Sequence, residues 1–135
     1  MSLAACSEDG GVTTPTSAST TTSTTVAEAS TTEEFVDSLP VGGSAFYSFS
    51  VAQFGTVNIT LNAVGGPFVP STAWVGLGIG QPSGTDCTTT ATVNVPPGAG
   101  PHLTGTYDAG VYCARVWDIG NLFGPARFQI SIAHP

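Results

Sequence analysis

The sequence predicts an all-β domain, an antiparallel β-sandwich of jelly-roll or immunoglobulin-like type with roughly seven to nine short strands. Two observations lead to this prediction. Apolar and polar residues alternate over many short segments, and Gly- and Pro-rich turn sequences separate these segments. No stretch has a helical period, and nothing in the pattern enforces closure into a barrel, so two packed sheets are favoured.

Three segments show the alternation most clearly, at residues 45–51, 56–62 and 127–132. Each has one apolar and one polar face, which is the pattern of a strand with one side on the core and the other in solvent. The residues predicted to point inward are Tyr47, Phe49, Val51, Val57, Ile59, Leu61, Phe128, Ile130 and Ile132.

Further strands are expected at residues 74–79, 87–95 and 111–117. In the first of these, the apolar face lies opposite Gly76 and Gly78. In the last, the alternation places Cys113 on the face opposite the core. The inward residues are Val75, Leu77, Ile79, Tyr112, Ala114 and Val116, and those sharing the outer face with Cys113 are Val111, Arg115 and Trp117.

The chain is expected to have three parts: residues 1–6, residues 7–32 and a folded domain at residues 33–135. Most residues from Thr13 to Thr32 are Thr or Ser. Such a segment has too little apolar surface to offset the entropy of ordering, so a disordered, solvated tether is predicted. An O-glycosylated stalk stays open as an alternative, as does an edge strand for a few residues near 31–36.

Charge is distributed unevenly along the chain. The formal net charge is −7, but from Ser38 onward there are only three aspartates against two arginines. The acidity therefore belongs mainly to the tether. Because the chain has no lysine, it lacks the basic surface that nucleic-acid binding requires, and anionic membranes are disfavoured as electrostatic partners.

The three cysteines indicate export. In an oxidising compartment an odd count favours one disulfide and one thiol with another role, so Cys87 and Cys113 are predicted to pair. The bridge would lie on an outer face or join neighbouring strands. Three free thiols in a cytosolic protein are the alternative.

Cys6 follows Leu-Ala-Ala, which resembles a bacterial lipobox and implies lipidation of Cys6. Only five residues precede it, none of them charged, so either the signal peptide is truncated or the match is accidental.

Two segments resemble a known family. Residues 107–116 read Tyr-Asp-Ala-Gly-Val-Tyr-Cys-Ala-Arg-Val, and residues 43–49 read Gly-Ser-Ala-Phe-Tyr-Ser-Phe. They resemble the "aGtYyvrV" and "yysF" motifs of bacterial pre-peptidase C-terminal domains, over residues 39–133. The resemblance implies a small β-sandwich of the kind found beside secreted peptidases and on other exported proteins. Cys113 departs from the pattern, because it stands at a position that varies in the family.

Catalytic and metal-binding patterns are weak. There is no Gly-x-Ser-x-Gly elbow, and His102 and His134 are expected to be exposed loop residues, so no enzyme is predicted. No cofactor is predicted either. Asp86, Asp108 and Asp118 fall in turns and are the only calcium candidates, although turn aspartates usually bond to their own backbone.

Exposed aromatic rings would indicate a carbohydrate site. Trp74, Trp117 and Phe46 are the stacking candidates, because each falls on the parity opposite a core face. The competing interpretation is that another part of the chain covers them.

The sequence thus predicts a non-enzymatic, exported protein of the bacterial cell envelope. It would be lipid-anchored through Cys6 and would bind or scaffold a surface protein or polysaccharide, with a carbohydrate-binding module as the alternative.

Overall fold

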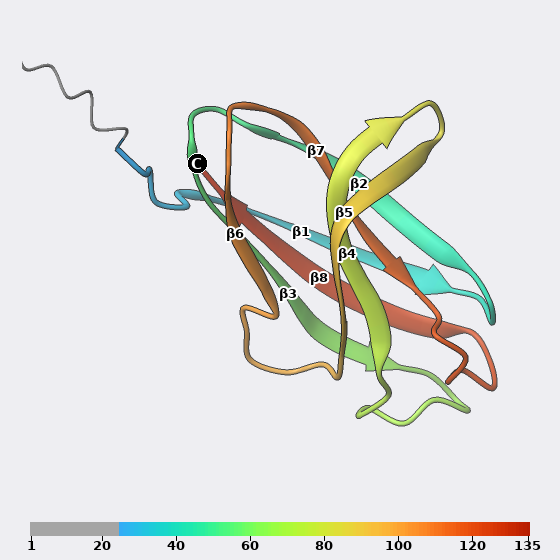
Figure 1. Ribbon diagram of the computed structural model, residues 1–135. Coiled ribbons are helices and arrows are strands. Elements are labelled where there is room, and N and C mark those ends of the chain that lie inside the picture. Colours follow the sequence, from blue (N-terminus) through green and yellow to red (C-terminus); the bar gives the residue numbers. More distant parts are fainter. Residues whose placement is uncertain (1–24) are drawn as a thin grey trace, which may run out of the picture.

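The computed structural model describes residues 25–135, and these residues fold into eight strands in two layers (Figure 1). The strands are β1 (Thr31–Leu39), β2 (Ser44–Val51), β3 (Gly55–Gly65), β4 (Val75–Ser83), β5 (Asp86–Val95), β6 (Leu103–Tyr107), β7 (Gly110–Trp117) and β8 (Ala126–His134). Cys6 and residues 7–24 of the expected tether lie outside the described residues. Within residues 25–135, no helix is long and apolar enough to cross a membrane.

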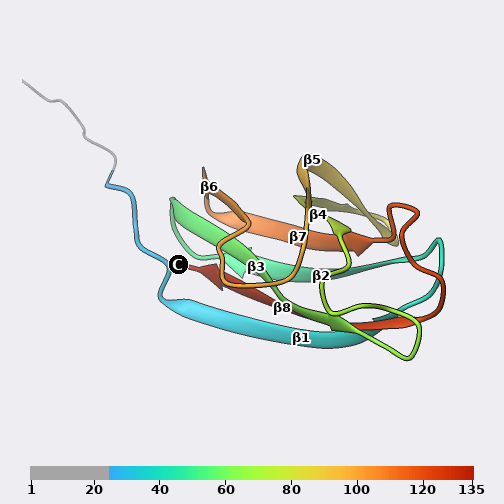
Figure 2. The ribbon, with the colours of Figure 1, turned by 90° about the horizontal axis from the view of Figure 1, so that it is seen from below.

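Both layers are antiparallel four-stranded sheets, in the orders β1-β8-β3-β6 and β2-β7-β4-β5. Viewed along the layers, the two sheets face each other (Figure 2). This confirms the predicted all-β antiparallel sandwich. Eight strands in two sheets of four match the jelly-roll alternative, because an immunoglobulin-like domain divides its strands unequally between its sheets.

The core lies between the sheets and contains the residues that the alternation assigned to it. Ile59, Leu61, Leu77 and Ile130 are among the most deeply buried side chains. Tyr47 is the least buried of the predicted inward residues. It stacks on Phe35 of β1, with 4.3 Å between ring centroids.

The folded domain begins earlier than expected. β1 starts at Thr31, two residues before the expected boundary, and Ala27 forms a parallel bridge to Gly55. The Ala27 N–H donates to the Phe54 carbonyl, and the Ala27 carbonyl accepts from the Thr56 N–H. The edge-strand alternative for residues near 31–36 therefore describes β1.

The sandwich has two distinct ends. At one end, which we call the base, Ala27, Gly55 and Pro135 meet. At the other end, which we call the loop end, the connections β1–β2 (residues 40–43), β3–β4 (66–74) and β7–β8 (118–125) lie together (Figures 1 and 2). The strand axes run from the base to the loop end.

Candidate functional site

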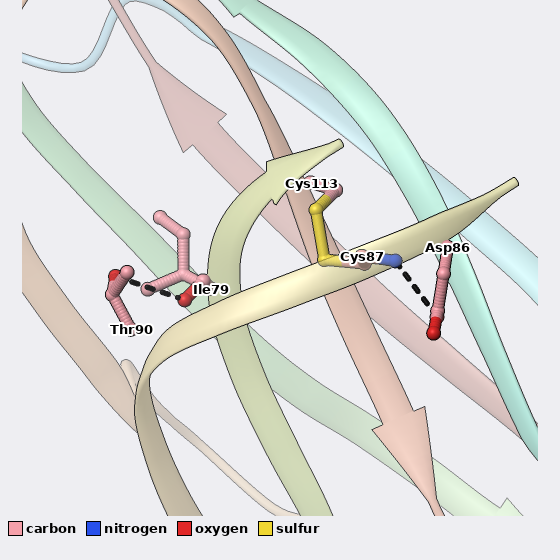
Figure 3. Close-up of a disulfide and its surroundings, with 5 residues drawn as sticks. All are labelled: Ile79, Asp86, Cys87, Thr90 and Cys113. Atoms are coloured by element: carbon pink, nitrogen blue, oxygen red, sulfur yellow. Dashed lines mark hydrogen bonds between the residues drawn. A yellow bond between two sulfur atoms is a disulfide. The ribbon is translucent and has the colours of Figure 1, made fainter. Parts of the chain in front are cut away.

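The predicted disulfide is present and joins Cys87 of β5 to Cys113 of β7, with 6.0 Å between the Cα atoms (Figure 3). These strands are not neighbours, because β4 lies between them in the sheet. Of the two placements expected for the bridge, an outer face or neighbouring strands, the structure has the outer face. Both cysteines are nevertheless fully buried, because the tip of the β4–β5 hairpin folds across that face.

A register shift between Ile79 and Gly80 lets the hairpin fold in this way. Beyond it, the chain of β5 passes so close to Gly80 that a Cβ there would overlap the Thr88 carbonyl. Glycine is needed at position 80 for this close approach of two backbones. The disulfide then holds the hairpin tip against β7.

The same outer face shows how Trp117 is accommodated. Its indole lies directly on Gly76, where any Cβ would overlap the ring, and it also approaches Gly78. The guanidinium of Arg115 lies 5.6 Å from the centre of the Trp117 ring, a cation–π arrangement. The glycines opposite the apolar face of β4 thus make room for the tryptophan.

The three stacking candidates differ in availability. Phe46 lies on β2 opposite Arg115, and both Phe46 and Trp117 are half-buried. Trp74 is 50% exposed, directly before β4. Of the three rings, only that of Trp74 is freely accessible.

The calcium candidates do not form a metal site. The Asp86 carboxylate accepts from the Cys87 N–H, and the Asp108 carbonyl accepts from the Tyr112 hydroxyl. Asp118 bonds to backbone N–H groups of the loop end. Within residues 25–135 there is no group of three or more His, Cys, Asp or Glu residues that could hold a metal ion.

Both histidines have structural partners. His102 lies in the loop before β6 as expected but is half-buried, whereas His134 is a buried residue of β8, so the expectation of exposed loop residues is corrected. The His102 Nδ1 accepts a 3.0 Å hydrogen bond from the Leu61 N–H, next to the bulge in β3. The His134 ring is buried at the base, with its Nε2 2.6 Å from the Glu33 carboxylate. Each ring thus ties two segments of the sandwich together.

The loop end carries the main apolar surface feature of the domain. Phe68 is 71% exposed and Phe123 is 87% exposed, and Val41 and Trp74 are exposed beside them on the same set of loops. Gly124 packs against the Phe68 side chain, which brings the two phenylalanine loops into contact. Exposed aromatic residues gathered on loops are typical of interaction sites.

Each phenylalanine has a buried neighbour in the sequence. Val69, next to Phe68, is 7% exposed, and Leu122, next to Phe123, is 5% exposed. These two aliphatic side chains anchor their loops in the core. The phenylalanines point outward and are therefore not required for anchoring.

Asp118 holds the loop end in one conformation. Its Oδ1 accepts from the N–H groups of Gly120, Asn121 and Leu122, and its Oδ2 accepts from the Gly42 N–H at 2.7 Å. Burial acts to raise the pKa of this carboxyl, but the four backbone donors together hold the pKa below its usual value. The Asn121 side chain donates in turn to the Trp74 carbonyl. One carboxylate and one amide thus join all three loops.

A separate hollow of about 270 Å³ lies on the sheet β1-β8-β3-β6. It is lined by Val36, Ala63, Val64, Gly65, Arg127, Phe128 and Gln129. Its volume is below the range of roughly 300–1,000 Å³ that is usual for small-molecule sites. The loop end is therefore the stronger candidate site.

Phe68 and Phe123 each stand in a Gly/Pro-rich segment of the sequence, which indicates a loop but does not bring the two residues together. The available signal was an aromatic residue beside an aliphatic one in a Gly/Pro-rich loop, which occurs in both segments. What joins these two loops is the hydrogen bond from the Asn121 side chain to the Trp74 carbonyl, together with the packing of Gly124 on Phe68. These long-range contacts have no local pattern.

Comparison with known proteins identifies no family. No protein-family model matches the chain, and no curated protein matches it. One solved structure with some likeness to this chain comes from work described as "Bacillus endospore appendages form a novel family of disulfide-linked pili". It is 13% identical, with a TM-score of 0.38, over 90% of this chain and 97% of that chain. A likeness of this size carries no conclusion about function, and the resemblance to pre-peptidase C-terminal domains stays a prediction.

Proposed function

We propose that this chain is a non-enzymatic, exported protein of the bacterial cell envelope that binds or scaffolds through its loop end. The observation that carries the proposal is the group of exposed aromatic side chains on loops locked by Asp118, at the opposite end from the base. A tether that enters at the base leaves the loop end accessible. Lipidation of Cys6 would supply the anchor.

The disulfide supports export. Disulfides form and persist mainly in oxidising compartments, and this one is fully buried in the fold. The shortage of basic residues, with two arginines and no lysine, argues against a nucleic-acid partner.

Structural duties of the polar residues support a non-enzymatic role. His102 and His134 bond to the backbone of β3 and to Glu33, and Asp118 bonds to four backbone N–H groups. A general base must instead be free to reach a substrate proton.

Carbohydrate binding is the second candidate, favoured by the exposed ring of Trp74. Sedimentation of the full chain with insoluble polysaccharides tests it. Retention that is lost in Trp74→Ala supports this function, and no retention removes it.

The location is tested by expressing the gene from its natural start in bacteria, fractionating the cells and trapping thiols. Recovery in the envelope fraction, with a lipid mass on the Cys6 peptide and Cys87 joined to Cys113, supports the proposal. Recovery in the cytosol with all three thiols free overturns it.

A further inference from the structure

We infer that the loop end inserts into the interface of an uncharged lipid surface, with Phe68, Phe123 and Trp74 as the inserting side chains. This inference names the partner of the surface proposed above and so rests on that proposed function. The argument has three parts: the area of the patch, its charge and the use of its polar groups.

The patch supplies the apolar part of a protein interface but little of its polar rim. An aromatic side chain can bury about 150–250 Å², so the exposed parts of the three rings offer roughly 400 Å². One side of a stable protein–protein interface buries about 800 Å², of which a little under half is polar, and the only charged group on these loops, Asp118, is bonded within them. Insertion into a lipid interface needs no complementary surface, and Phe and Trp side chains favour the boundary between headgroups and acyl chains.

The charge distribution fits an uncharged surface. Within the loops at residues 40–43, 66–74 and 118–125, Asp118 is the only charged residue. The charges next to these loops are Asp37, Arg115 and Arg127, and together with Asp118 they cancel.

The other charged residues of the described chain, all acidic, lie on β1 or before it, at the start of β5 and in the β6–β7 turn: Glu28, Glu33, Glu34, Asp86 and Asp108. These acids would hold the base away from anionic headgroups, so the neutral end is the one that can approach a membrane.

The carboxylate and the amide of the loop end favour lipid over sugar because both are already engaged, which leaves the hydroxyls of Ser71 and Thr72 as the exposed polar groups of the 66–74 loop. Sugar recognition needs side chains that can hydrogen-bond the ligand. Both carboxylate oxygens of Asp118 already accept backbone N–H groups, and the Asn121 amide already donates to the Trp74 carbonyl. Phe68 and Phe123 protrude from the loops, as inserting side chains would.

The tether is long enough for the loop end to reach the membrane that holds Cys6. Twenty residues lie between Cys6 and Ala27 and can span at most about 70 Å. The longest strand, β3, has 11 residues and a length of about 36 Å. A second contact of this kind would add to a lipid anchor, because two weak membrane signals together give stable attachment.

Trp74 offers a direct test, because the chain has two tryptophans and only Trp74 is largely exposed. The test uses the full chain carrying Cys6→Ser, titrated with phosphatidylcholine vesicles that contain brominated lipid. Insertion predicts a blue shift and quenching of the tryptophan emission. In Trp74→Phe these signals are lost, while sedimentation with the vesicles persists.

The double variant Phe68→Ser/Phe123→Ser should lower the vesicle partition coefficient by roughly tenfold for each ring removed. Val111→Ser is the matched control, because Val111 is also exposed but lies at the start of β7, near the base. It should partition like the parent. Because Phe68, Phe123 and Val111 are all exposed, the melting temperatures of the double variant and of the control should equal that of the parent, which would show that both variants fold.

Three results would overturn the inference. The first is absence of binding to phosphatidylcholine, or equal partition of the double variant and the control. The second is binding that strengthens severalfold when anionic lipid is added, because the uncharged loop end gives no reason for it. The third is a dimer, or retention on polysaccharide, that the double variant abolishes while vesicles are not bound. The vesicle assay does not depend on cellular location, so its failure and failure of the fractionation experiment can be told apart.

Discussion

Removal of the Cys87–Cys113 disulfide should lower the stability of the sandwich by an amount that the loop length sets. The bridge joins residues 26 apart, and in the chain-entropy model a closed loop of this size stabilises the fold by about 3.5 kcal/mol. Small domains have only about 5–15 kcal/mol in total, so this loss is a large fraction. The variant Cys87→Ala/Cys113→Ala should therefore unfold at a clearly lower denaturant concentration.

The assay is equilibrium unfolding in urea, followed by circular dichroism, on the full chain. Both the parent and the variant carry Cys6→Ser, so that no free thiol can exchange with the bridge. If the disulfide acts through the unfolded chain, the denaturant slope should also rise, because the variant unfolds to a more expanded state.

Local effects should appear in the β4–β5 hairpin. Its tip is bonded covalently to β7 across the width of β4, so amide exchange at Thr88 and Thr89 should become faster when the bridge is removed. The reasoning is refuted if the free energy of unfolding falls by less than about 1 kcal/mol, well below the loop-length value. A peptide map of the chain with Cys6 intact that links Cys87 or Cys113 to Cys6 would also refute it.

Three further predictions concern single residues. Gly76→Ala should lower the stability in thermal melts by about 1–3 kcal/mol and change the near-UV spectrum, because its Cβ would overlap the Trp117 indole that covers position 76. The control is Gly65→Ala, where a Cβ meets open space, and it should leave the stability unchanged. Asp118 has a lowered pKa in the fold, so its contribution to stability is present above the unfolded pKa of about 4 and is lost as the pH falls through the folded value. In urea unfolding at pH 7, the free energy of unfolding of Asp118→Asn should be lower than that of the parent by about 1–3 kcal/mol. It should also depend less on acid than that of the parent, and equal acid dependence would contradict this. His102→Ala leaves the Leu61 N–H without its acceptor and should cost about 1–2 kcal/mol in urea unfolding, and an unchanged midpoint would show that water replaces the ring.

The inward faces of the strands could be predicted because they depend on a local pattern. In a strand, each side chain alternates between two faces, so Val57, Ile59 and Leu61 could be assigned to the core without knowledge of their partners. The outer-face position of Cys113 followed from the same alternation. The burial of Cys113 could not be predicted in this way, because the hairpin that covers it folds at a register shift that has no pattern in the sequence.

The site could be predicted only in part. Trp74 was a stacking candidate from its parity, with a covered ring as the competing interpretation, and the structure leaves it 50% exposed; the importance of Phe68 and Phe123 was missed. These residues depend on how three loops from distant parts of the chain meet, through the bonds of Asp118 to Gly42 and of Asn121 to Trp74. A carboxylate that accepts from distant backbone groups leaves no periodic signal. The role of His102 could not be predicted for the same reason, because its ring accepts a hydrogen bond from the distant Leu61 N–H.

The opposite placement of the base and the loop end has a mechanical consequence. If the loop end is held by its partner and the chain is pulled through the residues before Ala27, the force first meets the short Ala27 bridge to Gly55, then enters at β1 and runs along the strand axes. β1 pairs with β8 over nine residue pairs, so the hydrogen bonds of this ladder would be loaded together in shear and not broken one after another. The disulfide lies in the other sheet and would carry none of this load directly. Resistance to pulling would therefore be set by the β1–β8 ladder, and the unfolding rate under force would measure it.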